Sequence, residues 1–173
     1  AGSNLKNLIK FSQQKKSPIS INLIICDSLK AKGLHFGKIF KIKGKVFNYI
    51  NKKKAEKKIL YALRKNKIKL ICLAGFMKIL SKNFIKKFDG KILNIHPSLL
   101  PKYKGLNTHE RAIKNNEKYS GCTVHYVTPK LDSGKIILQK KVKINKNESV
   151  KSLKKKVLIQ EHKIYTKAIS KIF

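Results

Sequence analysis

The sequence has 173 residues, enough for one domain with a sizeable core. Apolar residues make up 42% of it, which excludes a disordered chain, and no apolar run approaches the ~20 residues of a membrane-spanning helix. The net charge of +34 suggests nucleic-acid binding. However, only Arg64 and Arg111 are arginine, and the lysines are spread along the whole chain instead of forming one stripe. We therefore attribute the charge to compositional bias and expect no specific nucleic-acid partner and no membrane partner.

The first half of the chain alternates helical and strand-like patterns. In order, the apolar spacing predicts a helix after Ser3-Asn4 that ends by Pro18, strands over Ile19–Cys26 and Lys38–Ile42, a helix over Ala55–Lys67, a strand over Leu70–Ala74 and a helix from Ser81 to about Phe88. The continuous apolar run of Leu70–Ala74 is typical of a strand that is buried on both faces.

The second half continues with more strands and a long terminal helix. It contains predicted strands over Lys91–Ile95, Thr123–Val127 and Ile136–Leu138, and predicted helices over Thr108–Asn115 and Ser149–Phe173. We predict an α/β fold, a single domain over residues 1–173 with a mainly parallel central sheet flanked by helices. Such sheets bind ligands at the carboxyl ends of their strands. The loops Gly75–Leu80 and Asn94–Gly105 both follow predicted strands and are therefore candidate site loops.

The sharpest local signal is the run Asn94-Ile95-His96-Pro97-Ser98-Leu99-Leu100-Pro101. Asn94 and His96 are two residues apart at a strand end, so their side chains can point to the same side, and the two prolines stiffen the loop that follows. An amide can donate to a developing oxyanion and an imidazole can transfer protons, so the pair suits acyl transfer. The alternative for such a pair is a hydrogen-bonded structural role at the end of a strand.

This run closely resembles the signature of the folate-dependent formyltransferases, and other segments agree with that family in order and spacing. The resemblance extends from Gly2 to the last helix and is strongest to the members that formylate glycinamide ribonucleotide. The other matching segments are Ala74-Gly75-Phe76-Met77-Lys78-Ile79-Leu80, Lys102-Tyr103-Lys104-Gly105, Asn107-Thr108-His109, Gly121-Cys122-Thr123-Val124-His125, Leu131-Asp132-Ser133-Gly134 and Gln160-Glu161-His162.

The resemblance implies a Rossmann-like formyltransferase fold and three catalytic residues. Asn94 would polarise the formyl group and hold the oxyanion, and His96 would transfer protons. Asp132 would lie near His96 and stabilise its imidazolium form. Its local sequence alone favours the alternative of a turn-forming residue before glycine.

The resemblance also implies which residues bind the two substrates. Gly2, Ser3 and Asn4 would bind the ribonucleotide phosphate at a helix N-terminus, although by themselves they are a helix cap. Glu161 would contact the same substrate, and its alternative is a solvated helical acid. The implied folate-binding residues are Lys52, Met77, Lys78, Ile79, Leu80 and Asn94. Ordinary core is the alternative for the apolar members of this set, and a solvated charge run is the alternative for Lys52.

The sequence departs from the family pattern at three places. Lys78 stands where arginine is common, so a planar fork contact is lost, and Asn107 stands where the family often has histidine. The family's first strand and the start of its phosphate loop do not precede Ala1. We therefore expect an N-terminally truncated domain without its first strand.

The resemblance implies 10-formyltetrahydrofolate as cosubstrate, small-molecule partners and a monomer or homodimer. Residues His35, His109, His125 and His162 do not have metal-ligand spacing, so we expect no metal, and His125 is interpreted as structural. The three cysteines are interpreted as buried free thiols of a cytoplasmic protein. Two alternatives from the family remain, a methionyl-tRNA formyltransferase and a formyltetrahydrofolate hydrolase, and outside it a basic nucleic-acid-binding module.

Overall fold

The computed structural model describes residues 2–173, and the chain divides into two compact units. The first unit ends at Lys91 and the second runs from Ile92 to Phe173. Each unit has its own helices and strands, and each is described by itself below. The single domain expected over residues 1–173 stays a prediction.

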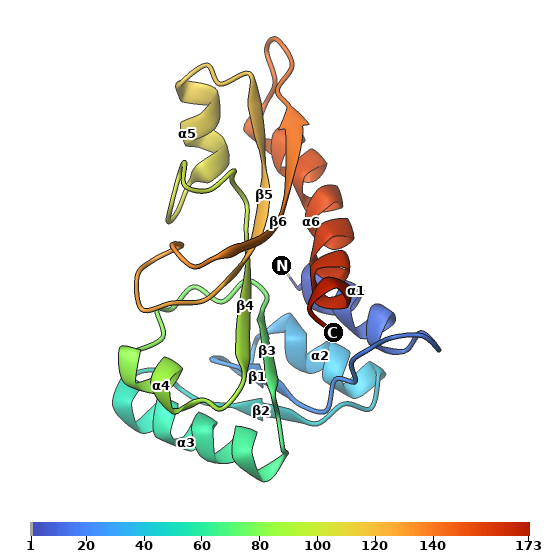
Figure 1. The fold of residues 1–173 in the computed structure, drawn as a ribbon, viewed down its shortest axis with the longest axis vertical. Helices are drawn as coiled ribbons and strands as arrows, with labels where there is room; N and C mark the ends of the chain where they lie inside the picture. Colours follow the sequence, from blue (N-terminus) through green and yellow to red (C-terminus); the bar gives the residue numbers. More distant parts are fainter. Residues whose placement is uncertain (1) are drawn as a thin grey trace. The chain divides into compact units, whose positions relative to one another are not determined.

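The first unit combines four helices with three short strands (Figure 1). Strands β1 and β2 pair in parallel, with Ile24 opposite Gly44 and Cys26 opposite Val46. Helix α2 packs on both strands. The elements in chain order are α1 Ser3–Ser12, β1 Ile24–Cys26, α2 Lys32–Ile39, β2 Gly44–Val46, α3 Lys52–Lys65, β3 Leu70–Leu73 and α4 Lys82–Lys87.

Helix α2 corrects the strand that we predicted over Lys38–Ile42. The segment is helical up to Ile39, and the strand comes later, at Gly44–Val46. Gly33 lies against β1, where a Cβ atom would approach the Cys26 sulfur at 3.0 Å and Leu5 at 3.2 Å. Two glycines lower the intrinsic helix propensity of this segment, but they let the helix pack closely on its neighbours. Tertiary packing therefore outweighs the local signal here.

Two strand predictions for this unit need correction, and so does the prediction that all three cysteines are buried. Helix α1 ends at Ser12, before Pro18 as predicted, but the strand predicted over Ile19–Cys26 forms only at Ile24–Cys26. Strand β3 is half-buried along its whole length instead of buried on both faces. All three cysteines are free, but only Cys122 is buried, whereas Cys26 and Cys72 are half-buried.

Helices α3 and α4 form as the sequence predicts, and a buried acid joins them. The Asn51 side chain caps α3 by accepting from the Lys54 N–H, and Ser81 caps α4 by accepting from the Phe84 N–H. Glu56 of α3 is only 5% exposed and accepts hydrogen bonds from both the backbone N–H and the hydroxyl of Ser81. This buried carboxylate fixes where α4 begins and so where the preceding loop ends.

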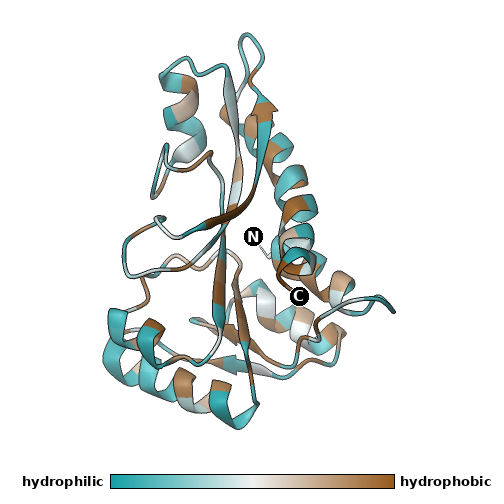
Figure 2. Cartoon of the chain, viewed as in Figure 1, coloured by the Kyte–Doolittle hydropathy of each residue, from teal (hydrophilic) through white to brown (hydrophobic). Residues whose placement is uncertain are grey.

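The second unit is an antiparallel ladder packed against a long helix (Figure 1). Strand β5 lies between β4 and β6, and α6 packs on β5 and β6. In Figure 2 the strands of this ladder carry brown, apolar residues and the helices carry both colours, as expected for helices with one buried face. The elements are β4 Lys91–His96, α5 Thr108–Lys114, β5 Tyr119–Tyr126, β6 Ile136–Lys143 and α6 Val150–Ile172.

Helix α6 has the buried face that the sequence predicts, with two differences. Leu153, Val157 and Ile169 are fully buried, whereas Val150 is only half-buried. The same face also buries Tyr165, whose hydroxyl donates to the Leu93 carbonyl of β4 at 3.2 Å. The α/β class is confirmed, with a parallel strand pair and flanking helices in the first unit and the antiparallel ladder in the second. Within residues 2–173, no helix is long and apolar enough to cross a membrane.

Candidate active site

Strand β4 delivers Asn94 and His96 to one place in the second unit. The ladder sets Asn94 opposite His125 and His96 opposite Thr123 on β5. Alternate residues of a strand share a face, so Asn94 and His96 point to the same side. Directly opposite residues of an antiparallel pair also share a face, so His125 and Thr123 point to that side as well. The sequence run that we singled out therefore lies beside a second strand that carries a histidine of its own.

The loop after β4 is tied to β5 and β6 by side chains. The Thr123 hydroxyl donates to the Ser98 carbonyl at 2.7 Å and accepts from the Leu100 N–H at 3.1 Å. Gln139 of β6 donates to the Leu100 carbonyl and to the Thr123 hydroxyl. The two bonds between Thr123 and the backbone of Ser98 and Leu100 are buried, where hydrogen bonds lose little to water. These bonds hold the loop rigidly against the ladder, and so they fix the position of His96 at the end of β4.

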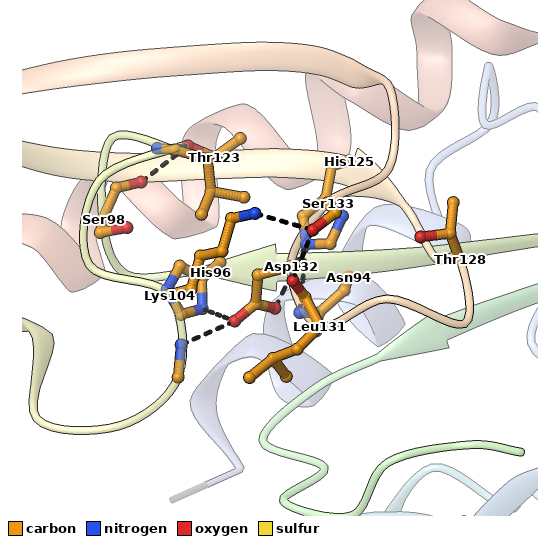
Figure 3. Close-up of polar contacts among 12 residues, drawn as sticks. Asn94, His96, Ser98, Lys104, Thr123, His125, Thr128, Leu131, Asp132 and Ser133 are labelled. Atoms are coloured by element: carbon orange, nitrogen blue, oxygen red, sulfur yellow. Dashed lines mark hydrogen bonds and ion pairs between the residues drawn. The ribbon is translucent and has the colours of Figure 1, made fainter.

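His96 is held from both ring nitrogens, and Figure 3 shows the contact of one of them with Asp132. Its Nε2 lies 2.8 Å from the Tyr103 carbonyl. A carbonyl can only accept, so Nε2 carries a hydrogen. Its Nδ1 faces an Asp132 carboxylate oxygen at 3.4 Å, and both side chains are less than 10% exposed. Because Nε2 is committed to the loop, Nδ1 is the ring nitrogen that faces the Asp132 carboxylate.

Asp132 is a hub for three partners. Its Oδ2 atom accepts from the Gly105 N–H at 2.9 Å and faces His96, and its Oδ1 atom lies 3.7 Å from His125 Nε2. Its backbone has a φ of 43°, in the left-handed region that Asp and Asn tolerate better than most residues. Asp132 is thus a turn residue and a histidine partner at the same time, so the two interpretations of Leu131-Asp132-Ser133-Gly134 are compatible.

His125 joins the same group of side chains, which its sequence context did not indicate. Its Nδ1 donates to the Tyr126 carbonyl at 2.9 Å, and burial lowers the pKa of the ring, an effect that the Tyr126 carbonyl and Asp132 partly oppose. In the neutral ring, Nε2 is an acceptor and lies 3.4 Å from the Asn94 amide nitrogen. His125 therefore orients the Asn94 amide, and the second N–H of that amide remains for another acceptor.

The N-terminal residues that we predicted to bind phosphate begin helix α1 in the first unit. Gly2 is the N-cap with a φ of 99°, a conformation that suits glycine, and a Cβ there would meet the Phe36 ring at 3.1 Å. Ser3 and Asn4 form the first turn, which contains no acidic side chain. Free backbone N–H groups and the positive end of the helix dipole favour an anion at such a position.

Glu161 is not the solvated helical acid of the alternative interpretation. It is only 8% exposed, on the buried face of α6. Burial, together with the nearby Glu161 carboxylate, raises the pKa of the Cys122 thiol to about 12. A carboxylate rarely lies so deep in a protein without a specific role, and the position was singled out only through the family resemblance.

The predicted folate-binding loop exposes large apolar side chains. Met77 is 75% exposed and Ile79 is 56% exposed, whereas Leu80 is 6% exposed. Ordinary core packing is therefore excluded for Met77 and Ile79, and it remains the structural role of Leu80. Lys78 lies between them with its side chain exposed. Large apolar side chains exposed on one loop are typical of a surface that binds a ligand.

Lys52 is the first residue of α3 and is exposed, as expected for part of a charge run. A cavity of about 160 Å³ opens beside this helix start, but Lys52 does not line it. The basic residues that line the cavity are Lys54 and Lys58, and Asn51 contributes its amide. The other departure position, Asn107, is the N-cap of α5 with a φ of 56°, so its role in this chain includes a left-handed backbone that Asn tolerates.

Comparisons with known proteins agree on one family. The family model described as formyl transferase matches residues 1–169. The chain is 41% identical to the phosphoribosylglycinamide formyltransferase of Haemophilus influenzae over 167 residues, which are 95% of this chain and 79% of that protein. It is 40% identical to the human trifunctional purine biosynthetic protein adenosine-3 over 97% of this chain, but it spans only 17% of that relative's length.

A solved structure gives the same answer. The crystal structure of phosphoribosylglycinamide formyltransferase from Brucella melitensis superposes with a TM-score of 0.93 at 40% identity, covering 99% of this chain and 90% of that one. The matches therefore extend over nearly the whole sequence, both in residue identity and in backbone. The chain belongs to the formyl transferase family.

Proposed function

We propose that this chain transfers the formyl group of 10-formyltetrahydrofolate to the amine of glycinamide ribonucleotide, a step of purine synthesis. The observation that carries the proposal is the cluster of Asn94, His96 and Asp132. The chain that holds it is 41% identical to the phosphoribosylglycinamide formyltransferase of Haemophilus influenzae. An amide donor, an imidazole and a carboxylate within one small region supply what acyl transfer to an amine needs.

In the proposed mechanism Asn94 is the oxyanion donor. The ribonucleotide amine attacks the formyl carbon, and the carbonyl oxygen becomes an oxyanion. One N–H of the Asn94 amide faces His125, so the other is the one that we assign to the oxyanion. Because His125 sets the amide orientation in advance, little reorganisation is needed when the charge develops, which is how preorganised donors lower a barrier.

His96 and Asp132 handle the protons. The attacking amine loses a proton and the folate nitrogen that leaves gains one, so no net proton is consumed. We assign the exchange to His96 Nδ1 and the Asp132 carboxylate, which face each other at 3.4 Å, with water relaying protons to the leaving nitrogen. His96 Nε2 stays bonded to Tyr103. The reaction as proposed has no covalent enzyme intermediate and no metal.

The remaining assignments concern binding and context. We assign Gly2, Ser3, Asn4 and Glu161 to the ribonucleotide, and Lys52, Met77, Lys78, Ile79, Leu80 and Asn94 to the folate. We infer a cytoplasmic enzyme, monomeric or homodimeric, with small-molecule substrates and no specific nucleic-acid partner. None of the three cysteines forms a disulfide, which supports a reducing compartment.

The deciding experiment is a formyl-transfer assay on the full-length protein with purified acceptors. Glycinamide ribonucleotide and methionyl-tRNA compete for 10-formyltetrahydrofolate, and a third reaction contains water alone. We expect formylated ribonucleotide as the main product. Formyl-methionyl-tRNA as the main product, or free formate without an acceptor, would replace the proposal with the corresponding family alternative.

The phosphate assignment makes a separate prediction. A carboxylate in the first turn of α1 stabilises the helix but repels a bound phosphate, so Ser3→Glu should raise the KM for the ribonucleotide by about 10-fold, equivalent to roughly 1.4 kcal/mol. The KM for the folate should not change, and the melting temperature should not fall. Ser3→Ala is the uncharged control. Equal changes in both KM values would argue against a phosphate at this helix end.

A further inference from the structure

The loop from Tyr103 to Gly105 supplies a hydrogen bond to each member of the histidine and aspartate pair. The Tyr103 carbonyl accepts from His96 Nε2, and the Gly105 N–H donates to Asp132 Oδ2. The only residue between them is Lys104. The conformation of these three residues therefore sets the tautomer of His96 and the position of the carboxylate together.

This loop has a backbone that does not hold itself in place. Tyr103 has a φ of 54°, in the left-handed region, which is unfavourable for a bulky residue. Such a conformation persists only when its surroundings determine it. The Tyr103 hydroxyl contributes by donating to Glu117 at 2.9 Å and accepting from the Asn115 amide at 3.0 Å.

Arg111 of α5 makes further contacts with the loop, in addition to the Lys104 side chain, which donates to the Ser133 hydroxyl at 2.8 Å. Its Nη1 atom donates to the Lys104 carbonyl at 2.7 Å and to the Leu106 carbonyl at 3.4 Å. Its guanidinium lies over the Tyr103 ring, 5.1 Å from the centroid. The exposed side chain thus contacts Tyr103, which bonds His96, and the residues on either side of Gly105, which bonds Asp132.

The composition of the chain makes this residue unusual. Of 42 basic residues only two are arginine, and the other one, Arg64, donates to the Lys87 carbonyl at 3.4 Å in the first unit. A guanidinium can stack on a ring and donate to two carbonyls at the same time, whereas an ammonium is a compact point charge without a planar face. A lysine lacks the planar group that lies over the Tyr103 ring while it donates to both carbonyls.

We propose that Arg111 is a positioning residue of the active site: it holds the Tyr103–Gly105 loop so that His96 keeps its Nε2 hydrogen and Asp132 faces Nδ1. It acts through the loop and contacts no reacting atom. The inference rests on the proposed roles of His96 and Asp132, so its test includes a measurement that does not need turnover.

The test compares Arg111→Lys with Arg64→Lys, which makes the same change at the only other arginine. Since small displacements of catalytic groups cost up to 10²-fold in rate, we expect Arg111→Lys to lower kcat by about 10-fold or more with KM nearly unchanged. Arg64→Lys should leave both constants unchanged. Arg111→Gln, which retains one donor for the Lys104 carbonyl, should also lower kcat and gives a second variant of the same exposed site.

The measurement without turnover is the ¹⁵N spectrum of the His96 ring. The unmodified protein should show a hydrogen at Nε2, and Arg111→Lys should show a mixture of the two neutral tautomers. A tautomer shift without any formyl transfer in the unmodified protein would refute the proposed function and keep this inference. An unchanged ring spectrum and kcat in Arg111→Lys, or equal losses in both lysine variants, would overturn the inference.

Discussion

Replacing Asn94 with alanine should lower kcat by about 10²–10³-fold, the usual cost of removing one oxyanion donor. The structure gives this amide a fixed direction, because one N–H faces the His125 ring nitrogen at 3.4 Å. The interaction with the oxyanion exists only in the transition state, so the KM values should change much less than kcat. Steady-state kinetics with both substrates measure the split.

The control for this prediction is Asn83→Ala, at an exposed position of α4 where alanine favours the helix. It should leave kcat and KM unchanged. Asn94→Ala also leaves His125 Nε2 without its amide partner, so circular dichroism must show that the variant is folded. Near-normal turnover in a folded Asn94→Ala protein would remove this amide from the mechanism.

The elements that could be predicted from sequence are those whose signals are local. Helix α4 has its Ser81 cap and α6 its spaced apolar residues, and β4 has an apolar run stopped by Pro97. Helix α2 and strand β2 were missed because their stability depends on partners. Gly33 and Gly37 weaken the helical pattern, and close packing against β1 and its surroundings, which a linear sequence does not display, compensates for them.

The candidate site divides in the same way. Asn94 and His96 stand two apart in one run, and Asp132 is conspicuous in a chain with only eight acidic residues. His125 depends on the register of β4 with β5, and a shift of one residue would turn it to the other face. The positioning role of Arg111 depends on the left-handed backbone of Tyr103, a conformation that bulky residues rarely adopt. Neither feature can be derived from spacing alone.

Asp132→Asn should lower the rate at least as much as Asn94→Ala does, with little cost to the stability of the fold. Asparagine tolerates the left-handed backbone at this position, where φ is 43°. Its amide oxygen can take the place of Oδ2 and accept from the Gly105 N–H, and its NH₂ group can then face His125 Nε2 as a donor. The variant therefore keeps the shape and the hydrogen bonds of the turn and removes one charge.

That charge is what the proposed proton route requires. With a neutral amide oxygen in front of Nδ1, the imidazolium form of His96 loses its anionic partner at 3.4 Å, and the carboxylate of the proposed proton route is gone. General acid–base catalysis contributes about 10²–10⁴-fold, so kcat should fall by a factor in that range, with the melting temperature close to that of the unmodified protein. Asp89→Asn, at an exposed acid that pairs with Lys69 in the first unit, is the matched control and should retain full activity. If Asp132→Asn keeps more than about a tenth of the rate, Asp132 serves the turn and not the chemistry.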